Sequence, residues 1–192
     1  MRDGARTRDR ILHEALALFA ERGIDGTSVR DIAQAVGVAE AALYRHFRSK
    51  DEIARDLFLV NYAALAADVL AIGAQDERFA IRLEKLVGLF ARLFDENPAL
   101  FAFLLINQHR HLAEVDAAPG RNPVAAVALV LREAIERRDI PPQDPDLAAA
   151  MALGLVVQPA VFHLYGRLTG PLSARVPAIT AATGAVLGTG RS

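Results

Sequence analysis

Cysteine is absent from this chain of 192 residues. Without cysteine the protein can form neither a disulfide framework nor a metal site built from thiolates. The length is sufficient for one large domain, or for a small domain joined to one of medium size.

Long hydrophobic runs are also lacking. The longest uninterrupted apolar stretch, residues 147–157, is well short of the roughly 20 residues that span a bilayer. Residues 1–6 do not contain the apolar segment of a signal peptide. We therefore expect a soluble, cytoplasmic protein with no membrane partner, although 53% of its residues are hydrophobic.

There is little excess charge of one sign. The 22 Lys and Arg residues nearly balance 23 Asp and Glu residues, giving a net charge of −1. The overall charge therefore does not identify a nucleic-acid-binding protein. Residues 1–50 carry a net charge of +2 and the remainder −3, an asymmetry too weak to support such a function by itself.

No segment alternates apolar and polar residues as a half-buried strand does, and helical spacing occurs almost everywhere. Glycine, proline and capping residues divide this pattern into about nine helices, which predicts an all-α fold. The expected helices are 11–22, 28–36, 38–47, 49–72, 77–95, 98–115, 123–139, 145–166 and 172–188.

The most informative stretch is 27–50. Thr27 or Ser28 can cap a short helix, and Asp31 suits the positive first turn of that helix. Gly37 then permits a tight turn into a second short helix. The apolar residues available to pack between the two helices are Val29, Ile32, Ala33, Val36, Val38, Leu43 and Phe47. This pattern predicts a helix-turn-helix at 28–47, whose second helix enters the major groove of DNA.

The same stretch resembles the TetR family of transcriptional regulators. The matching positions are Thr27, Ile32-Ala33, Gly37-Val38, Leu43-Tyr44, Phe47 and Ser49-Lys50. The resemblance covers roughly residues 5–65 and implies a three-helix DNA-binding domain there. It further implies that residues 66–192 form a helical domain for effector binding and dimerisation.

Several candidate DNA contacts follow from the resemblance. Lys50 and the free N–H groups of its helix are expected to bind one phosphate, although a solvated surface lysine is the alternative. Tyr44 and His46 are expected at the DNA backbone. The expected contacts to phosphates of the opposite strand are Thr27, Ser28 and Arg30. Three arginines near the start either reach DNA as well or form a solvated arm: Arg6, Arg8 and Arg10.

The residues that could read bases lie on the second short helix. The methyl groups of Ala39 and Ala42 can contact thymine, and Glu40 can accept a hydrogen bond from a cytosine amine. Arg45 can either read guanine or hold a phosphate. Ala39 replaces a serine that is frequent in the family, and Ala41 replaces a glycine, so the operator sequence does not follow from the resemblance.

The C-terminal part is rich in aromatic residues at helical spacing, most of which we expect in the core. By the resemblance, some of its residues line a pocket for a small apolar or amphipathic effector. The candidates are Phe90, Phe94, Phe103, Asn107, His111, Gln158 and Phe162. Pro159 within a helix either opens that cavity by bending the axis or merely kinks a buried helix.

The last two expected helices carry small and branched residues that would let helices pack closely. The resemblance implies that they form a four-helix interface in a homodimer. A dimer suits the mechanism, because two recognition helices related by a two-fold axis can read two half-sites of an operator. An effector that favours another state would then spoil their spacing and release the DNA.

No catalytic constellation and no glycine-rich phosphate loop occurs in the sequence, so we expect neither an enzyme nor a bound cofactor. We also expect no metal, because the rings of His109 and His111 would point about 200° apart on a helix. Two other functions remain open: a helical small-molecule-binding protein, and a DNA-binding protein without an effector. Release from DNA by a ligand would separate the latter from a sensor.

Overall fold

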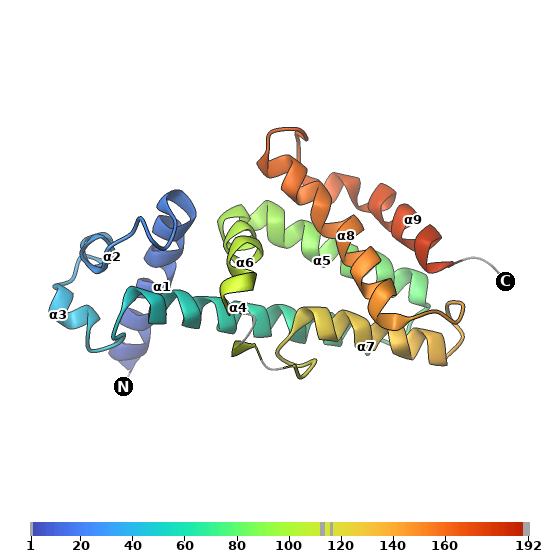
Figure 1. Ribbon diagram of the computed structural model, residues 1–192, viewed down its shortest axis with the longest axis horizontal. Helices are drawn as coiled ribbons and strands as arrows, with labels where there is room; N and C mark the ends of the chain where they lie inside the picture. Colours follow the sequence, from blue (N-terminus) through green and yellow to red (C-terminus); the bar gives the residue numbers. More distant parts are fainter. Residues whose placement is uncertain (1, 112–113, 116, 190–192) are drawn as a thin grey trace. The chain divides into compact units, whose positions relative to one another are not determined.

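The computed structural model describes residues 2–111, 114–115 and 117–189, and within them it contains nine α-helices and no strand (Figure 1). The α-helices are α1 (Arg2–Arg22), α2 (Val29–Val36), α3 (Glu40–Leu43), α4 (Lys50–Gly73), α5 (Phe79–Glu96), α6 (Pro98–His111), α7 (Pro123–Glu136), α8 (Pro145–Leu164) and α9 (Val176–Leu187). A short 3-10 helix, η2 (Leu172–Arg175), precedes α9. The predicted all-α fold is confirmed.

Helix ends follow local chemistry at most of the predicted boundaries. Asn122 accepts hydrogen bonds from the N–H groups of residues 124 and 125 at the start of α7, and Asp144 does the same for residues 146 and 147 at the start of α8. Proline occupies the first turn of both helices. The largest differences from prediction are at three of the expected helices, and the first is that α3 spans only Glu40–Leu43 instead of 38–47. Helix α1 begins at Arg2, and the expected helix 172–188 is divided into η2 and α9 near Pro177.

The chain forms two compact units. Unit 1 consists of Met1–Asn61 with Ala99–Val115, and unit 2 of Tyr62–Pro98 with Asp116–Ser192. Helix α6 therefore packs with the N-terminal helices. The division into a DNA-binding domain 5–65 and an effector domain 66–192 is a functional prediction, and it does not coincide with these packing units.

Unit 1 is organised around a continuous apolar core. Its fully or nearly fully buried members include Ile11, Phe19, Ile32, Val36, Leu43, Phe47, Ile53 and Phe58. Phe103 of α6 joins this core by stacking on Phe19, with ring centroids 6.1 Å apart and planes 15° from parallel. The helix-turn-helix is thus held by α1, α4 and α6, whose buried faces contribute to one core.

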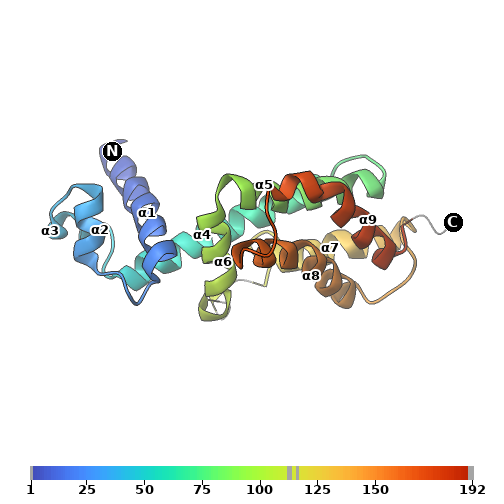
Figure 2. The ribbon, with the colours of Figure 1, turned by 90° about the horizontal axis from the view of Figure 1, so that it is seen from above.

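Unit 2 is a helical bundle in which α5, α7, α8 and α9 lie side by side (Figure 2). Buried Arg82 of α5 donates hydrogen bonds to the carbonyl of Gly73, at 2.8 Å, and to the carboxylate of Asp139, at 2.9 Å. The same guanidinium lies over the ring of Phe79, 5.6 Å from its centroid. The buried guanidinium of Arg82 therefore links α5 to the end of α4 and to the residues after α7.

A carboxylate fixes the approach to α9. Asp95, near the end of α5, accepts hydrogen bonds from the backbone N–H groups of Leu172 and Ser173, at 2.7 and 2.9 Å. Partial burial acts to raise the pKa of Asp95, but the hydrogen bonds from Ser173 and Leu172 outweigh it and lower that pKa. The ionised carboxylate therefore satisfies the first N–H groups of η2.

Helices α4 and α8 are each long and apolar enough, by length and composition alone, to cross a membrane. Polar residues such as Asn61 and Gln158 divide the apolar stretches of these helices, so neither helix contains an uninterrupted apolar run of about 20 residues. Only 33% of the apolar window of α4 and 28% of that of α8 is buried. Much of the apolar surface of α8 is therefore open in a single copy of the chain.

Candidate functional site

Helix α2 begins with a complete capping box. The hydroxyl of Ser28 accepts a hydrogen bond from the N–H of Asp31 at 3.1 Å, and the Asp31 carboxylate accepts one from the N–H of Ser28 at 2.8 Å. The carboxylate also accepts from the Ser28 hydroxyl, and this bond is the main reason that the pKa of Asp31 is lowered. Ser28 is exposed, as its predicted contact with a phosphate requires, but its hydroxyl already has this partner.

Gly37 ends α2 in the left-handed region, with φ of +74°, which residues with a Cβ seldom adopt. The turn leads to the one-turn helix α3. Its N-cap residue, Ala39, makes no side-chain hydrogen bond to the helix. Leu43 is fully buried and anchors α3 to the core. The short helix therefore owes its position to packing and to Gly37.

Most of the predicted DNA contacts lie on α3 and on the residues that flank it. Tyr44 is 52% exposed, and Ala39, Glu40 and Arg45 are also exposed. Ala42 and His46 are partly covered. These six residues therefore lie together on one segment of the surface, which is the arrangement that reading a major groove requires.

Two predicted phosphate contacts have other partners. Thr27 is only 1% exposed, and its hydroxyl donates a hydrogen bond to the carbonyl of Gly23 at 2.8 Å. The ammonium group of Lys50 donates to the carbonyls of Asp25 and Thr27, at 3.1 and 2.9 Å. In this conformation Thr27 is covered, and two of the three N–H donors of Lys50 are paired with backbone carbonyls, so a phosphate contact by either residue stays a prediction.

Arg6 of α1 is exposed, whereas the other two predicted arginines of this helix contact the fold. Arg8 pairs with Asp56 at 2.6 Å and lies over the ring of Phe47, 4.9 Å from its centroid. Arg10 donates to the carbonyl of Val36, also at 2.6 Å. Since α1 is helical from Arg2, these arginines belong to a helix and not to an extended arm.

An open groove runs between the start of α2, helix α3 and the start of α4. Predicted Arg30 lies along it, and so does Arg48, which the sequence pattern did not single out. Arg48 is exposed and immediately follows the buried Phe47. The groove also contains the carboxylates of Asp31 and Glu40, so its charge is mixed and positive charge alone does not mark it. In the sequence, the single indication of Arg48 is its position directly after Phe47, a residue expected in the core.

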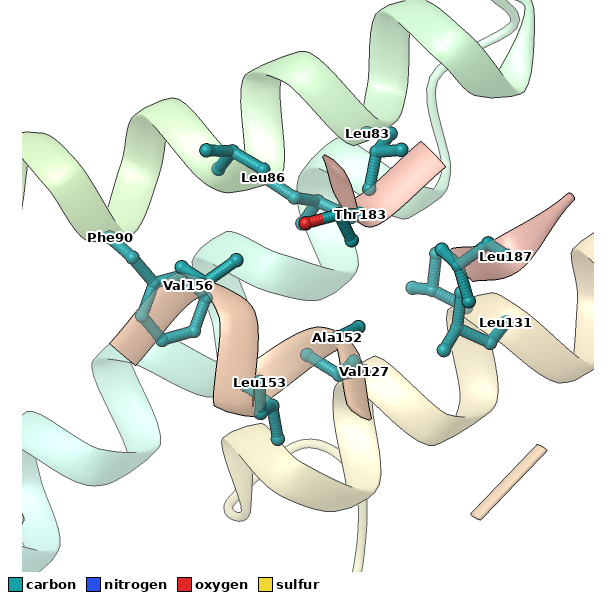
Figure 3. A pocket seen from close by; sticks show the side chains of 12 residues that line it. Leu83, Leu86, Phe90, Val127, Leu131, Ala152, Leu153, Val156, Thr183 and Leu187 are labelled. Atoms are coloured by element: carbon teal, nitrogen blue, oxygen red, sulfur yellow. The ribbon is translucent and has the colours of Figure 1, made fainter. Parts of the chain in front are cut away.

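The structure places a small cavity inside unit 2. Side chains from α5, α7, α8 and α9 converge on it, among them Leu86, Phe90, Leu131 and Val156 (Figure 3). Its volume is about 30 Å³. Thr183 is the polar residue of the lining, but its hydroxyl donates to the carbonyl of Ile179 at 2.8 Å. The cavity therefore offers an apolar surface to whatever enters it.

Comparison with known proteins identifies the N-terminal segment. Residues 11–57 match the family described as "Bacterial regulatory proteins, tetR family", a segment that includes α2, α3 and the groove residues Arg30 and Arg48. This segment of the chain is therefore similar to the tetR family.

Curated transcriptional regulators match this chain over part of their length. The chain is 40% identical over 91 residues to the HTH-type transcriptional repressor KstR2 of Mycobacterium tuberculosis (strain ATCC 25618 / H37Rv), which covers 46% of this chain and 42% of that protein. It is 33% identical over 130 residues to the HTH-type transcriptional regulator TcmR of Streptomyces glaucescens, covering 66% of this chain and 49% of that protein. The chain thus spans less than half the length of these relatives.

Solved structures extend the similarity of fold to nearly the whole chain. The tetR-family regulator PfmR of Thermus thermophilus shares 26% identity and a TM-score of 0.71, covering 93% of this chain and 97% of PfmR. The regulator FadR of Bacillus subtilis, solved in complex with stearoyl-CoA, shares 18% identity and a TM-score of 0.78, covering 91% of this chain and 96% of FadR. The tetR-family fold therefore includes unit 2.

The predicted effector residues are divided between the two units. In unit 2, Phe90 lines the cavity, whereas buried Phe94 packs edge-on against His163 with ring centroids 5.0 Å apart. Gln158 and Phe162 lie along an open groove on α8.

The remaining predicted effector residues belong to unit 1. Phe103 stacks on Phe19, and Asn107 donates a hydrogen bond to the carbonyl of Phe103 at 2.9 Å. Buried His111 packs against Phe58, with ring centroids 5.2 Å apart, and its Nδ1 lies 3.5 Å from Glu114. Each of the three therefore has a packing or hydrogen-bonding role within unit 1.

No group of three metal-binding side chains occurs among the residues that the structure describes. The side chain of His109 lies outside that part of the chain, so the predicted absence of a metal stays a prediction. The matched relatives are named as regulators and not as enzymes.

Proposed function

We propose that this protein is a transcriptional regulator, acting as a repressor, that binds operator DNA through α3 and the groove beside it. The observation that carries the proposal is the exposed α3 of a tetR-family helix-turn-helix, anchored by the buried Leu43. Its proposed DNA contacts are Ser28, Arg30, Ala39, Glu40, Ala42, Tyr44, Arg45, His46 and Arg48. The name of the relative KstR2, a transcriptional repressor, supports repression over activation.

The proposed effector is a small apolar or amphipathic molecule that enters unit 2. The lining of the unit 2 cavity supports this class, because it is apolar apart from Thr183, whose hydroxyl is already paired. FadR, which has the same fold, is solved with stearoyl-CoA, and an acyl chain is an effector of this chemistry. At about 30 Å³ the cavity holds little more than a methylene group, so effector binding requires that it open.

Selection of bound fragments from random-sequence duplexes by the purified protein tests the DNA-binding proposal. We expect an enriched, palindromic sequence whose affinity falls steeply with salt, because contacts with phosphates release counterions. Adding acyl-CoA esters to the complex then tests release. A protein that selects no duplex would refute the proposal. A protein that binds DNA but ignores every apolar ligand would be a DNA-binding protein without an effector.

We also propose a homodimer built on α8 and α9. On α8, Leu147 is 57% exposed, Met151 39% and Phe162 46%, and they follow one another at helical spacing along one face. Exposed alanines on α9 would allow a second copy to approach closely. Pairing these faces would cover the apolar surface and would bring together two recognition helices, as a palindromic operator requires.

Leu147→Glu tests this interface. A carboxylate buried against a second copy lacks a partner, so we expect the variant to sediment as a monomer and to lose its preference for a palindrome. Val124→Glu is the matched control, because Val124 is 45% exposed on α7 of the same unit but outside the proposed interface. A monomeric wild-type protein at micromolar concentration would contradict the proposal.

The location in the cytoplasm follows from the proposed function, because operator DNA is found there in bacteria. It remains part of the proposal. The proposed activity involves no catalytic step and no cofactor.

A further inference from the structure

Two faces of α8 differ in what covers them. One face lines the cavity of unit 2 through Ala152 and Val156 (Figure 3). Another face borders an open groove of about 440 Å³, many times the volume of that cavity. The residues that line the groove are Gly154, Leu155, Gln158, Pro159, Phe162 and Leu168. In a single copy of the chain this groove is open to solvent and has room for large side chains.

Gly154 is a residue that packing within one copy does not require. A Cβ at this position would meet no atom within 4 Å among the residues that the structure describes, so alanine would fit equally well. Glycine inside a helix lowers the stability of that helix relative to alanine, because it loses more backbone entropy on folding. Close approach of another backbone from outside the chain is a reason for glycine at such a position.

Pro159 and Gln158 place a hydrogen-bond acceptor and a donor beside the same groove. Proline has no N–H, so Pro159 cannot donate to the carbonyl of Leu155, four residues before it in α8. Gln158 is exposed, and its amide makes no hydrogen bond within the part of the chain that the structure describes. The otherwise apolar groove therefore contains one carbonyl without its helical donor and one amide without a partner.

The outward residues of α8 have the spacing of a seam along which two helices pack. Steps of four, three and four residues separate Met151, Leu155, Gln158 and Phe162. In a pair related by a two-fold axis, residue i contacts residue j and j contacts i. An antiparallel pair centred between Leu155 and Gln158 sets each of these two against the other in the second copy. The same alignment sets Met151 against Phe162.

We propose that Gln158 selects the partner of α8: its amide donates to the Leu155 carbonyl of a second copy, and this contact fixes an antiparallel register. A second copy fits the groove because the groove is complementary to itself, each copy supplying the donor that Pro159 denies to the other. A single polar contact in an apolar seam specifies register, since any other alignment buries an amide without a partner. The inference rests on the proposed homodimer and adds to it the register and the selecting residue.

Disulfide formation between introduced cysteines tests the register, because the chain has no cysteine of its own. Two differently tagged variants, Met151→Cys and Phe162→Cys, are produced together and oxidised mildly. The proposed register sets these two positions opposite each other, so mixed disulfides should exceed same-variant disulfides by about tenfold or more. Copies of the same position are offset by 11 residues, roughly 16 Å along the axis, which is too far for a disulfide.

A preference for same-variant disulfides would indicate a different alignment and would overturn the proposed register. The absence of both products from protein that sediments as a dimer would do so too, while the homodimer itself would stand. Wild-type protein that remains monomeric would instead refute the homodimer. The failure of the inference is therefore distinguishable from that of the proposed function.

Gln158→Leu tests the selecting role. Leucine makes the seam wholly apolar, so shifted alignments no longer bury an unpaired amide, and the preference for the mixed disulfide should fall at least about threefold while the protein remains a dimer. Arg132→Leu is the matched control, because it adds a leucine at an exposed position of α7, outside the groove, and should leave the preference unchanged. An unchanged preference in Gln158→Leu would exclude Gln158 as the selecting residue.

Gly154→Ala tests the close approach of the second copy. The added methyl group has room in one copy but would meet Pro159 of the other in the proposed register, so we expect the dissociation constant of the dimer to rise about tenfold. Gly120→Ala is the matched control, because a Cβ at Gly120 also meets nothing within 4 Å and lies outside α8. Sedimentation over a dilution series measures both variants. An equal dissociation constant for Gly154→Ala and the wild type would contradict the proposed contact.

Discussion

Phe47→Ala should lower the free energy of unfolding by about 3–5 kcal/mol and abolish selective binding to duplex DNA. Phe47 is 1% exposed, and it lies four residues after Leu43, the last residue of α3. The substitution removes a large apolar side chain and leaves a cavity. It also removes the ring over which the guanidinium of Arg8 lies. Such a loss is a large share of the roughly 5–15 kcal/mol that typically stabilises a folded protein.

Equilibrium unfolding in urea, combined with titration of the selected duplex, measures both effects. Tyr44→Ala is the matched control, because Tyr44 lies three residues earlier but is 52% exposed. We expect the control to change the free energy of unfolding by less than about 0.5 kcal/mol while it weakens DNA binding. If Phe47→Ala unfolded at the same urea concentration as the wild type, Phe47 would not anchor the helix-turn-helix.

Asp139→Ala should cost about 3 kcal/mol of unfolding free energy, more than the removal of its partner. Arg82 is 1% exposed, and without Asp139 its charge would remain buried with the Gly73 carbonyl as its hydrogen-bond acceptor. Asp139 itself is 33% exposed, so after Arg82→Met its carboxylate would be solvated by water. Methionine would also fill much of the apolar space left by the arginine side chain.

The order of the two effects is the critical result. We expect Arg82→Met to cost no more than about half as much as Asp139→Ala in urea unfolding, and the double variant to resemble Arg82→Met. The double variant serves as the control, since it lacks both charges. A larger loss for Arg82→Met than for Asp139→Ala would show that the hydrogen bond to Gly73, and not the ion pair, determines the stability at this site.

The helical fold was predictable because its determinants are local. Asn122 and Asp144 cap the helices that follow them, and Gly37 has the left-handed conformation that the predicted turn requires. The exposure of Tyr44 was predictable from helical spacing, because Leu43 is buried and the next residue along the chain then points away from the core. Short-range chemistry thus predicted both the fold class and the segment that presents the candidate DNA contacts.

The roles of Lys50 and Thr27 could not be predicted in this way. Lys50 donates to backbone carbonyls that lie 23 and 25 residues away in the sequence. Because every residue has a backbone carbonyl, no sequence pattern indicates which of them a lysine binds. Thr27 donates to the carbonyl of Gly23 only because of the shape of the turn. Both residues match the family pattern, but that pattern does not distinguish a phosphate contact from a support for the turn.

The division of the predicted effector residues between two units could not be predicted from the sequence, because periodicity gives the face of a helix and not its neighbours. Phe103 and Phe90 have similar apolar surroundings in the sequence, yet Phe103 packs on α1 in unit 1 and Phe90 lines the cavity of unit 2. An aromatic residue in a buried position contributes to a core far more often than to a ligand site. Only tertiary packing separates the two cases.

Helix α3 consists of a single turn without a side-chain cap at its start. A lone turn is unfavourable in water, because fixing its dihedral angles costs more entropy than its first hydrogen bond offsets. The order of this segment is therefore supplied by the burial of Leu43 and, in the proposed complex, by duplex DNA as well. Association with an operator should then carry an entropic penalty of local ordering, and mismatched sequences, which contact the turn less completely, would leave it unwound.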